Sequence, residues 1–142
     1  MLLTNSDAAN QSQSYNYKPL DLTKQQIRLI TLRPGPADCP VQCDLETFDI
    51  DSRPPYLALS YTWGPPSPTA SILIDGKHFE VRQNLYDFLL AFRNAEHNKE
   101  YIWIDQICIS QGHTEERNHQ VQLMSKIYED CFWVIIWLGY ES

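Results

Sequence analysis

Residues 56–63 read YLALSYTW, and this run decides which fold the rest of the chain is expected to build. Only Ser60 and Thr62 interrupt its apolar character. A short and nearly continuous apolar run is typical of a strand buried on both faces, as in a parallel sheet. Prolines stand on both sides, at Pro54-Pro55 and after Gly64, so we expect the strand to occupy this interval alone.

Two further runs have the same character: YIWIDQI at residues 101–107 and FWVIIWL at residues 132–138. A helical pattern precedes each of them. The first predicted helix has a buried face formed by Leu85, Phe88, Leu89 and Phe92, with Asn84 as its N-terminal cap. The second begins near Thr114, and its expected buried stripe is Val121, Met124, Tyr128 and Cys131. Buried strands joined by helices predict a parallel sheet covered on both faces.

The first half of the chain reads as added β-structure. Residues 26–32 alternate between apolar and polar side chains and predict a half-buried strand. Residues 41–50 alternate more loosely, and four acids lie within or just after them (Asp44, Glu46, Asp49 and Asp51), which favours an exposed edge strand. Asp75-Gly76 lies between two short strands and predicts a hairpin turn. The expected fold is therefore α/β, with a mainly parallel sheet flanked by helices, an N-terminal β extension and a β-hairpin.

Charge excludes two classes of partner. The chain of 142 residues carries 11 basic and 18 acidic side chains and a formal net charge of −7. Nucleic acids and anionic membranes bind clustered Lys and Arg, so we expect neither as a partner. Protein partners or self-association remain.

Residues 1–16 are rich in Asn, Ser and Gln and read as a disordered segment ahead of one domain at residues 17–142. The start has no basic region that would indicate a secretory signal, and the longest apolar run, residues 131–138, is too short to span a membrane. We therefore expect a cytoplasmic protein with four reduced cysteines. A central strand at residues 132–138 would normally be followed by a covering helix, so the sequence is expected to be part of a longer protein.

Three stretches carry a specific resemblance to a known family. They are YLALSYTWG at residues 56–64, IWIDQICISQ at residues 102–111, and a spaced pattern from Glu116-Arg117 to Trp137-Leu138-Gly139. Together they closely resemble the fungal heterokaryon-incompatibility (HET) domain, over about residues 17–139. The departures are few: Gln106 stands where Ala is usual, Ser110 where Asn is usual, and Cys131 where Ala is usual.

This resemblance implies a role in allorecognition and programmed cell death in a filamentous fungus. It also implies a relation to the Toll/interleukin-1 receptor (TIR) fold, which has a flavodoxin-like sheet. Some TIR domains cleave NAD, so NAD is the substrate that the resemblance suggests, with no bound cofactor.

Ligands of open α/β sheets bind beyond the carboxyl ends of the strands. This rule predicts a polar pocket built from strand ends and from the start of the second helix. The strand ends contribute Ser60, Tyr61, Trp63 and Asp105; the helix contributes Glu116, Arg117 and Gln120; and the family motif adds Ser110 and Gln111. Glu116 is the candidate catalytic carboxylate.

Each candidate also has a purely structural interpretation. Asp105 and Arg117 are expected to form an ion pair that leaves Glu116 beside the pocket, yet acids in a first helical turn are favoured by the helix dipole alone. A Cys108 nucleophile with His113 or His119 as its base is one alternative, although a thiol that follows an apolar strand is more often buried and inert. Metal-ligand spacing is absent, so no metal site is expected.

Three functions remain open at this point. The domain could cleave NAD through Glu116, act without chemistry as an interaction and self-assembly domain of a larger fungal receptor-like protein, or serve only as a structural part of such a protein. The surroundings of Glu116 distinguish them, since catalysis requires this carboxylate to face a ligand.

Overall fold

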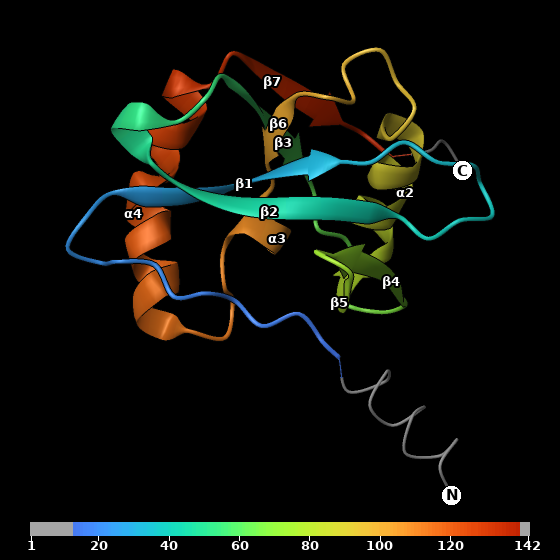
Figure 1. The fold of residues 1–142 in the computed structure, drawn as a ribbon, viewed down its shortest axis with the longest axis horizontal. Coiled ribbons are helices and arrows are strands. Elements are labelled where there is room, and N and C mark those ends of the chain that lie inside the picture. Colours follow the sequence, from blue (N-terminus) through green and yellow to red (C-terminus); the bar gives the residue numbers. More distant parts are fainter. Residues whose placement is uncertain (1–12, 140–142) are drawn as a thin grey trace, which may run out of the picture.

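Residues 13–139 are the part of the chain that the computed structural model describes, and their strands form a single mixed sheet (Figure 1). The strands are β1 (Gln26–Leu32), β2 (Gln42–Asp49), β3 (Tyr56–Tyr61), β4 (Thr69–Ile74), β5 (Lys77–Arg82), β6 (Tyr101–Trp103) and β7 (Trp133–Trp137). Their order across the sheet is β5-β4-β2-β1-β6-β3-β7. Residues 1–12, most of the expected disordered segment, lie outside the described residues.

The three strands predicted to belong to one parallel sheet do share a sheet. Strand β3 pairs in parallel with β6 on one side and with β7 on the other. The 101–107 run is a strand only as far as Trp103, because residues 105–108 turn into the short helix α3 (Asp105–Cys108). Asp105 therefore begins a helix instead of ending a strand.

The predicted fold class is nevertheless wrong, because the sheet is mixed and not a helix-flanked, mainly parallel one. Strands β1, β2, β4 and β5 enter the same sheet, and β1–β2, β1–β6 and β4–β5 are antiparallel pairs. Besides α3, the described residues form two longer helices, α2 (Gln83–Phe92) and α4 (Thr114–Asp130), and the 3₁₀ turn η1 (Ile50–Ser52). The three apolar runs thus form the parallel strands β6, β3 and β7 at one end of the sheet. The strands β1, β2, β4 and β5 make up the rest of it.

Strand β2 is also placed differently from the prediction. It lies inside the sheet, paired with β1 from Gln26 opposite Asp49 to Leu32 opposite Cys43. On its other side it pairs in parallel with β4, through Gln42 with Leu73 and Cys43 with Ile74. Its acidic residues predicted an edge strand. Instead, β4 pairs with the side of β2 that faces away from β1, and β5 forms the edge of the sheet.

The hairpin turn at Asp75-Gly76 is confirmed. Both residues have positive φ, 51° for Asp75 and 81° for Gly76, as a turn of this type requires. The predicted cap of α2 is wrong, because the helix begins at Gln83 and the Asn84 side chain instead donates to the Thr62 carbonyl oxygen at 2.5 Å.

Helix α4 buries the predicted stripe only in part. Met124, Tyr128 and Cys131 pack partly buried against the core, but Val121 is 53% exposed. The fully buried residues of the helix are Glu116, Gln120, Leu123 and Ile127. Two polar side chains replace apolar ones on the inner face because each meets a polar partner on or beside β1, as described below. Tyr56 and Tyr128 hold α4 against β3, with their hydroxyls donating to the Ile127 and Leu59 carbonyls.

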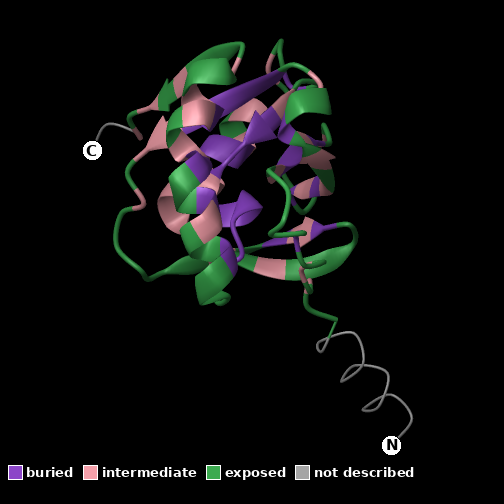
Figure 2. Ribbon diagram, turned by 90° about the vertical axis from the view of Figure 1, so that its left-hand side faces the viewer, coloured by how far each residue is buried: buried purple, intermediate pink, exposed green. Residues whose placement is uncertain are grey.

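The buried residues gather in the central strands and the inner helix faces (Figure 2). The outermost strand β7 is different: it was expected to be a central, covered strand, but it lies at one edge of the sheet with several apolar side chains in solvent. Of the helices in the described part of the chain, none is long and apolar enough to cross a membrane.

Candidate functional site

Two polar clusters meet at helix α3, and most of the predicted site residues belong to one or the other. We call them the Asp105 cluster, formed by Tyr61, Trp63, Asp105, Gln106 and Gln111, and the Arg28 cluster, formed by Tyr17, Arg28, Cys108 and Glu116. Asp105 is the first residue of α3 and Cys108 the last, so this single short helix positions both clusters.

In the Asp105 cluster, both carboxylate oxygens are engaged. Oδ1 of Asp105 accepts a hydrogen bond from the Tyr61 hydroxyl at 2.9 Å, and Oδ2 accepts one from Trp63 Nε1 at 3.0 Å. Burial, followed by the charge of Asp105, raises the pKa of Tyr61 well above its ordinary value, so its hydroxyl stays protonated as a donor. Asp105 thereby ties the end of β3 and the segment after it to the start of α3.

Two amide side chains extend this cluster. Gln106 Nε2 donates to the Tyr61 hydroxyl at 3.0 Å, and its Oε1 accepts from the backbone N–H of Arg82 at 2.7 Å. Gln111 Nε2 donates to the Asp105 carbonyl at 3.0 Å. The guanidinium of Arg82 lies over the Trp63 ring at 4.9 Å. Gln106 therefore links the cluster to the end of β5.

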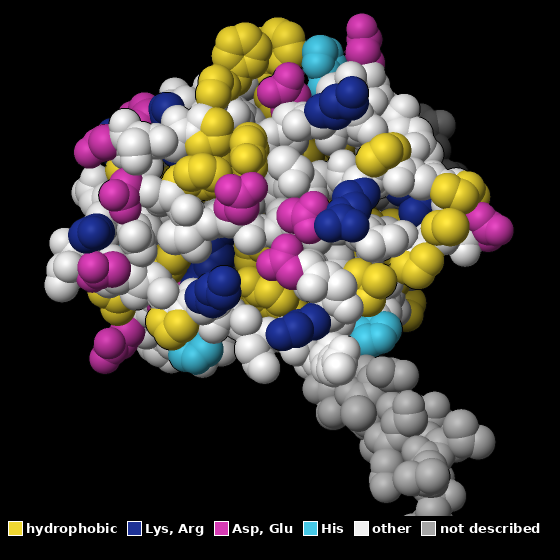
Figure 3. All heavy atoms as spheres, in the orientation of Figure 1, with side chains coloured by type: hydrophobic (Ala, Val, Ile, Leu, Met, Phe, Trp, Pro, Cys, Tyr) yellow, Lys and Arg dark blue, Asp and Glu magenta, His cyan; other side chains and the backbone are white. Residues whose placement is uncertain are grey.

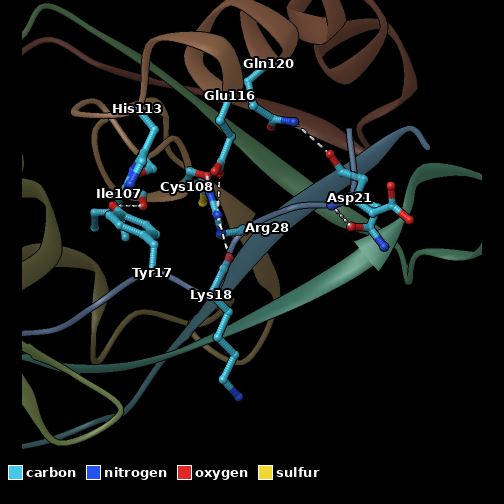
Figure 4. A network of polar contacts seen from close by, with 11 residues as sticks. Tyr17, Lys18, Asp21, Arg28, Ile107, Cys108, His113, Glu116 and Gln120 are labelled. Carbon is cyan, nitrogen blue, oxygen red and sulfur yellow. Dashed lines mark hydrogen bonds and ion pairs between the residues drawn. The ribbon is translucent and has the colours of Figure 1, made fainter. Parts of the chain in front are cut away.

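The Arg28 cluster surrounds a charged side chain that is 1% exposed (Figure 4). Arg28 forms an ion pair with Glu116, its Nη1 donates to the Cys108 carbonyl at 3.1 Å, and its Nη2 donates to the Lys18 carbonyl at 2.9 Å. The Tyr17 ring lies 4.7 Å from the guanidinium, and the Tyr17 hydroxyl donates to the Ile107 carbonyl. Burial of a charge at this depth requires such partners.

This arrangement overturns the expected ion pair of Asp105 with Arg117. Arg117 is exposed, both oxygens of Asp105 are used by Tyr61 and Trp63, and Glu116 pairs with Arg28. Glu116 is 6% exposed and points inward, so it does not flank an open pocket. The sequence placed the right residue types near α3 but assigned the wrong partners.

The remaining candidates are dispersed. Gln120 is fully buried, and its Nε2 donates to the Gln26 carbonyl at 2.7 Å. Ser110 is 2% exposed and its Oγ lies 2.6 Å from His113 Nδ1 in a hydrogen bond. Ser60 is half-buried in β3. Neither hydrogen bond brings its residue to an open surface.

Sequence reasoning missed Arg28, which a signal in β1 could have identified. Arg28 shares one face of the strand with Ile30 and Leu32, and the apolar residues Ile27 and Leu29 occupy the other face. An arginine between apolar neighbours on both faces of a strand is a buried arginine and needs a carboxylate. Glu116, inward-facing on α4, is that carboxylate.

A hollow of about 420 Å³ does lie at the carboxyl ends of β3 and β7, where the sequence predicted a pocket. It is lined by Thr62, Gly64, Pro65, Pro68, Gln83, Asn84, Asp87, Leu138 and Gly139, and by none of the predicted site residues. Among residues 13–139, no group of three or more His, Cys, Asp or Glu side chains is placed to hold a metal ion.

The cysteines are all thiols, and Cys108 is the one that was weighed as a nucleophile. It is fully buried, and burial raises its pKa to about 12, which leaves almost no thiolate at neutral pH. His113, its candidate base, instead pairs with Ser110. The geometry therefore favours a buried and unreactive Cys108 thiol over a catalytic one.

Comparisons with known proteins agree on one family. A sequence model described as heterokaryon incompatibility protein (HET) matches residues 56–142. Over 151 aligned residues the chain is 34% identical to the Neurospora crassa protein named heterokaryon incompatibility protein 6, OR allele; the match covers 96% of this chain and 22% of that protein. The chain thus spans about a fifth of the length of this curated relative. No solved structure matches it.

Proposed function

Because the chain belongs to the heterokaryon incompatibility (HET) family, we propose that it acts in fungal heterokaryon incompatibility as an interaction domain without chemistry of its own. In this role it triggers programmed cell death by bringing protein chains together. The family and the curated relative support the process, and the surroundings of Glu116 support the mode of action.

The observation that carries the proposal is the ion pair of Glu116 with Arg28. Cleavage of NAD through a TIR-like site needs a carboxylate that can face the ribose of a bound ligand. Glu116 is instead 6% exposed and opposed by a buried guanidinium. If the Glu116 side chain turned away from Arg28 to face a ligand, Arg28 would stay buried without its ion-pair partner, which is energetically unfavourable.

The Asp105 carboxylate supports the same conclusion. It lies closer to the carboxyl edge of the sheet, but hydrogen bonds from Tyr61 and Trp63 occupy both of its oxygens. Both candidate acids therefore serve to hold strands and helices together.

The test is expression of the chain from an inducible promoter in Neurospora crassa, with growth and the cellular NAD pool followed together. We expect growth to stop while NAD stays constant until the cells die. The Arg33→Ala variant is the matched control, because it removes an arginine whose ion pair with Asp44 is exposed and should arrest growth as well as the unchanged chain.

A purified sample answers the enzymatic alternative directly. We expect no nicotinamide when the chain is incubated with NAD at high protein concentration. Nicotinamide release that disappears in a Glu116→Gln variant would contradict the proposal and support catalysis, and continued growth under full expression would contradict a role in incompatibility.

A further inference from the structure

Residues 13–18 form an extended segment, which we call the strap, that runs from the sheet edge at β5 to the interior of the molecule. In Figure 1 the strap (blue) passes from the vicinity of β5 below α3 before the chain turns back into β1. At β5 the N–H of His78 donates to the Gln13 carbonyl at 3.0 Å, and the N–H of Tyr15 donates to the His78 carbonyl at 2.8 Å. These bonds form one parallel bridge, so the strap is held at this edge in the same way as an added strand.

Two tyrosines, Tyr15 and Tyr17, fix the rest of the strap. Their rings meet edge to face with 5.2 Å between the centroids, and the ring of Tyr17 lies 6.1 Å from that of Phe79 on β5. The Tyr17 ring also lies over the guanidinium of Arg28, and its hydroxyl donates to the Ile107 carbonyl (Figure 4). The strap is thus anchored by two aromatic residues two positions apart, whereas the side chains between and beside them are exposed.

The strap spans a hollow instead of packing flat on the sheet. This hollow of about 280 Å³ is lined by two strap residues, Tyr15 and Lys18, and by Arg28, Leu45, Glu46, Thr47 and Asp75. Side chains of both charges lie close together on this side of the molecule (Figure 3). A segment over a hollow forgoes the contacts that close packing would give it, so the strap is released more easily than a packed strand.

Strand β5 offers a second pairing position that the strap leaves unused. Backbone groups of alternate residues point to the outer side of an edge strand, so those of His78, Glu80 and Arg82 share the outer side of β5. His78 pairs with the strap, and the N–H of Arg82 donates to Gln106. Among residues 13–139, no backbone hydrogen bond reaches Glu80 on this side. An extended segment that kept the register of the strap would pair at both His78 and Glu80.

We propose that the site occupied by the strap is the docking site for an extended segment of a partner protein, and that the strap is the intramolecular competitor that keeps this site closed. The strap identifies the chemistry of the partner segment. Its backbone pairs in parallel with β5, and two aromatic side chains two positions apart take the places of Tyr15 and Tyr17. The guanidinium of Arg28 favours an aromatic ring at the second place. This inference rests on the proposed function, since it names the surface through which the interaction domain takes its partner.

The test is the fluorescence anisotropy of a labelled peptide with the sequence of residues 13–19, QSYNYKP, titrated with the purified chain. The strap of the unchanged chain competes with the peptide, so binding should be weak. Tyr17→Ala removes the ring over Arg28 and the hydrogen bond to Ile107, so the peptide should bind about tenfold more tightly. Asn16→Ala is the matched control, because this strap side chain is exposed, and it should bind the peptide as weakly as the unchanged chain.

A second peptide, in which alanine replaces both tyrosines, should not bind Tyr17→Ala, because it lacks the side chains that select the segment. A circular dichroism melt shows whether Tyr17→Ala is folded. If it is not, Tyr17→Phe decides, since it keeps the ring over Arg28 and loses only the hydrogen bond of the hydroxyl. This variant should bind the first peptide about threefold more tightly than the unchanged chain.

The proposal is overturned if the folded variant binds the first peptide no more tightly than the unchanged chain, or if the alanine peptide binds equally well. Light scattering adds one further outcome. Dimers of the unchanged chain that the peptide dissociates would assign the site to the strap of a second copy and overturn the assignment to a partner protein. None of these readouts involves growth or NAD, so failure here leaves the proposed function to its own test.

Discussion

The interior around Arg28 and the outer strand β7 distribute charge and apolar surface in opposite ways. Arg28 is a charged side chain at 1% exposure, while Ile136 is an apolar side chain at 68%. The charge of Arg28 is paired with Glu116, and the carbonyls of Lys18 and Cys108 accept hydrogen bonds from its guanidinium. The Ile136 side chain is not covered by any of the described residues.

This comparison shows where the chain supplies its own partners. A buried charge with its partners in place stabilises one arrangement of the chain and offers little to a ligand. An exposed apolar side chain adds little to the stability of the isolated fold and is unfavourable in solvent. Glu116 and Asp105, which the sequence singled out, both have partners within the chain, whereas the strand that it treated as core lies at an edge of the sheet.

The largest effect is expected from Arg28→Ala, which leaves Glu116 buried without its partner. The free energy of unfolding should fall by about 3–5 kcal/mol, measured by urea denaturation. Arg33→Ala is the control, since its ion pair with Asp44 is exposed and should cost less than about 1 kcal/mol. Equal losses in the two variants would mean that the interior pair is no more important than a surface pair.

Thiol labelling should show the same contrast between interior and surface. Burial raises the pKa of Cys108 to about 12, whereas Cys39 is exposed. In native conditions near pH 8, iodoacetamide should modify Cys39 faster than Cys108 by more than about a hundredfold, as measured by mass spectrometry of peptides. Comparable rates in the folded protein would show that the region around Arg28 opens to solvent.

A smaller loss is expected from Asp105→Ala, which removes the acceptor of the Tyr61 and Trp63 hydrogen bonds. Hydrogen bonds to a charged group support a loss of about 1.5–3 kcal/mol in urea denaturation. Tyr61→Phe removes only one of the two and should cost about 1 kcal/mol. If Asp105→Ala were as stable as the unchanged chain, Asp105 would be a binding residue held at the expense of stability.

The smallest effect on the isolated fold is expected at β7. Ile136→Ser should change the free energy of unfolding by less than about 0.5 kcal/mol at concentrations where the chain is monomeric, because this side chain is already in solvent. Ile135→Ser is the internal comparison, as the neighbouring side chain packs against the core and should cost more. A large loss at Ile136 would place it in a covered core.

Local patterns in the sequence predicted the elements well and their surroundings less well. The run at residues 56–63 and the Asp75-Gly76 turn are determined by neighbouring residues, and both predictions are confirmed. The place of β2 and β7 in the sheet depends on pairing between distant segments, which no local pattern contains. An apolar run at residues 132–138 therefore looked like a central strand although it forms an edge.

The expected ion pair of Asp105 with Arg117 was wrong for a related reason. The strand-end rule led to residues around α3, yet the partner of Glu116 lies on β1, far away in the sequence. Which carboxylate meets which arginine depends on the order of the strands, which no local pattern contains.

Hydrogen–deuterium exchange of the unchanged chain tests the central claim most directly, because it reports the interior around Arg28 and the outer strand β7 separately. We predict that backbone amides of β1, which is paired on both sides, exchange more slowly than the amides of residues 133–137 that point away from the sheet. Exchange in β1 as fast as in β7 would contradict the account of Arg28 as a buried charge held by its partners.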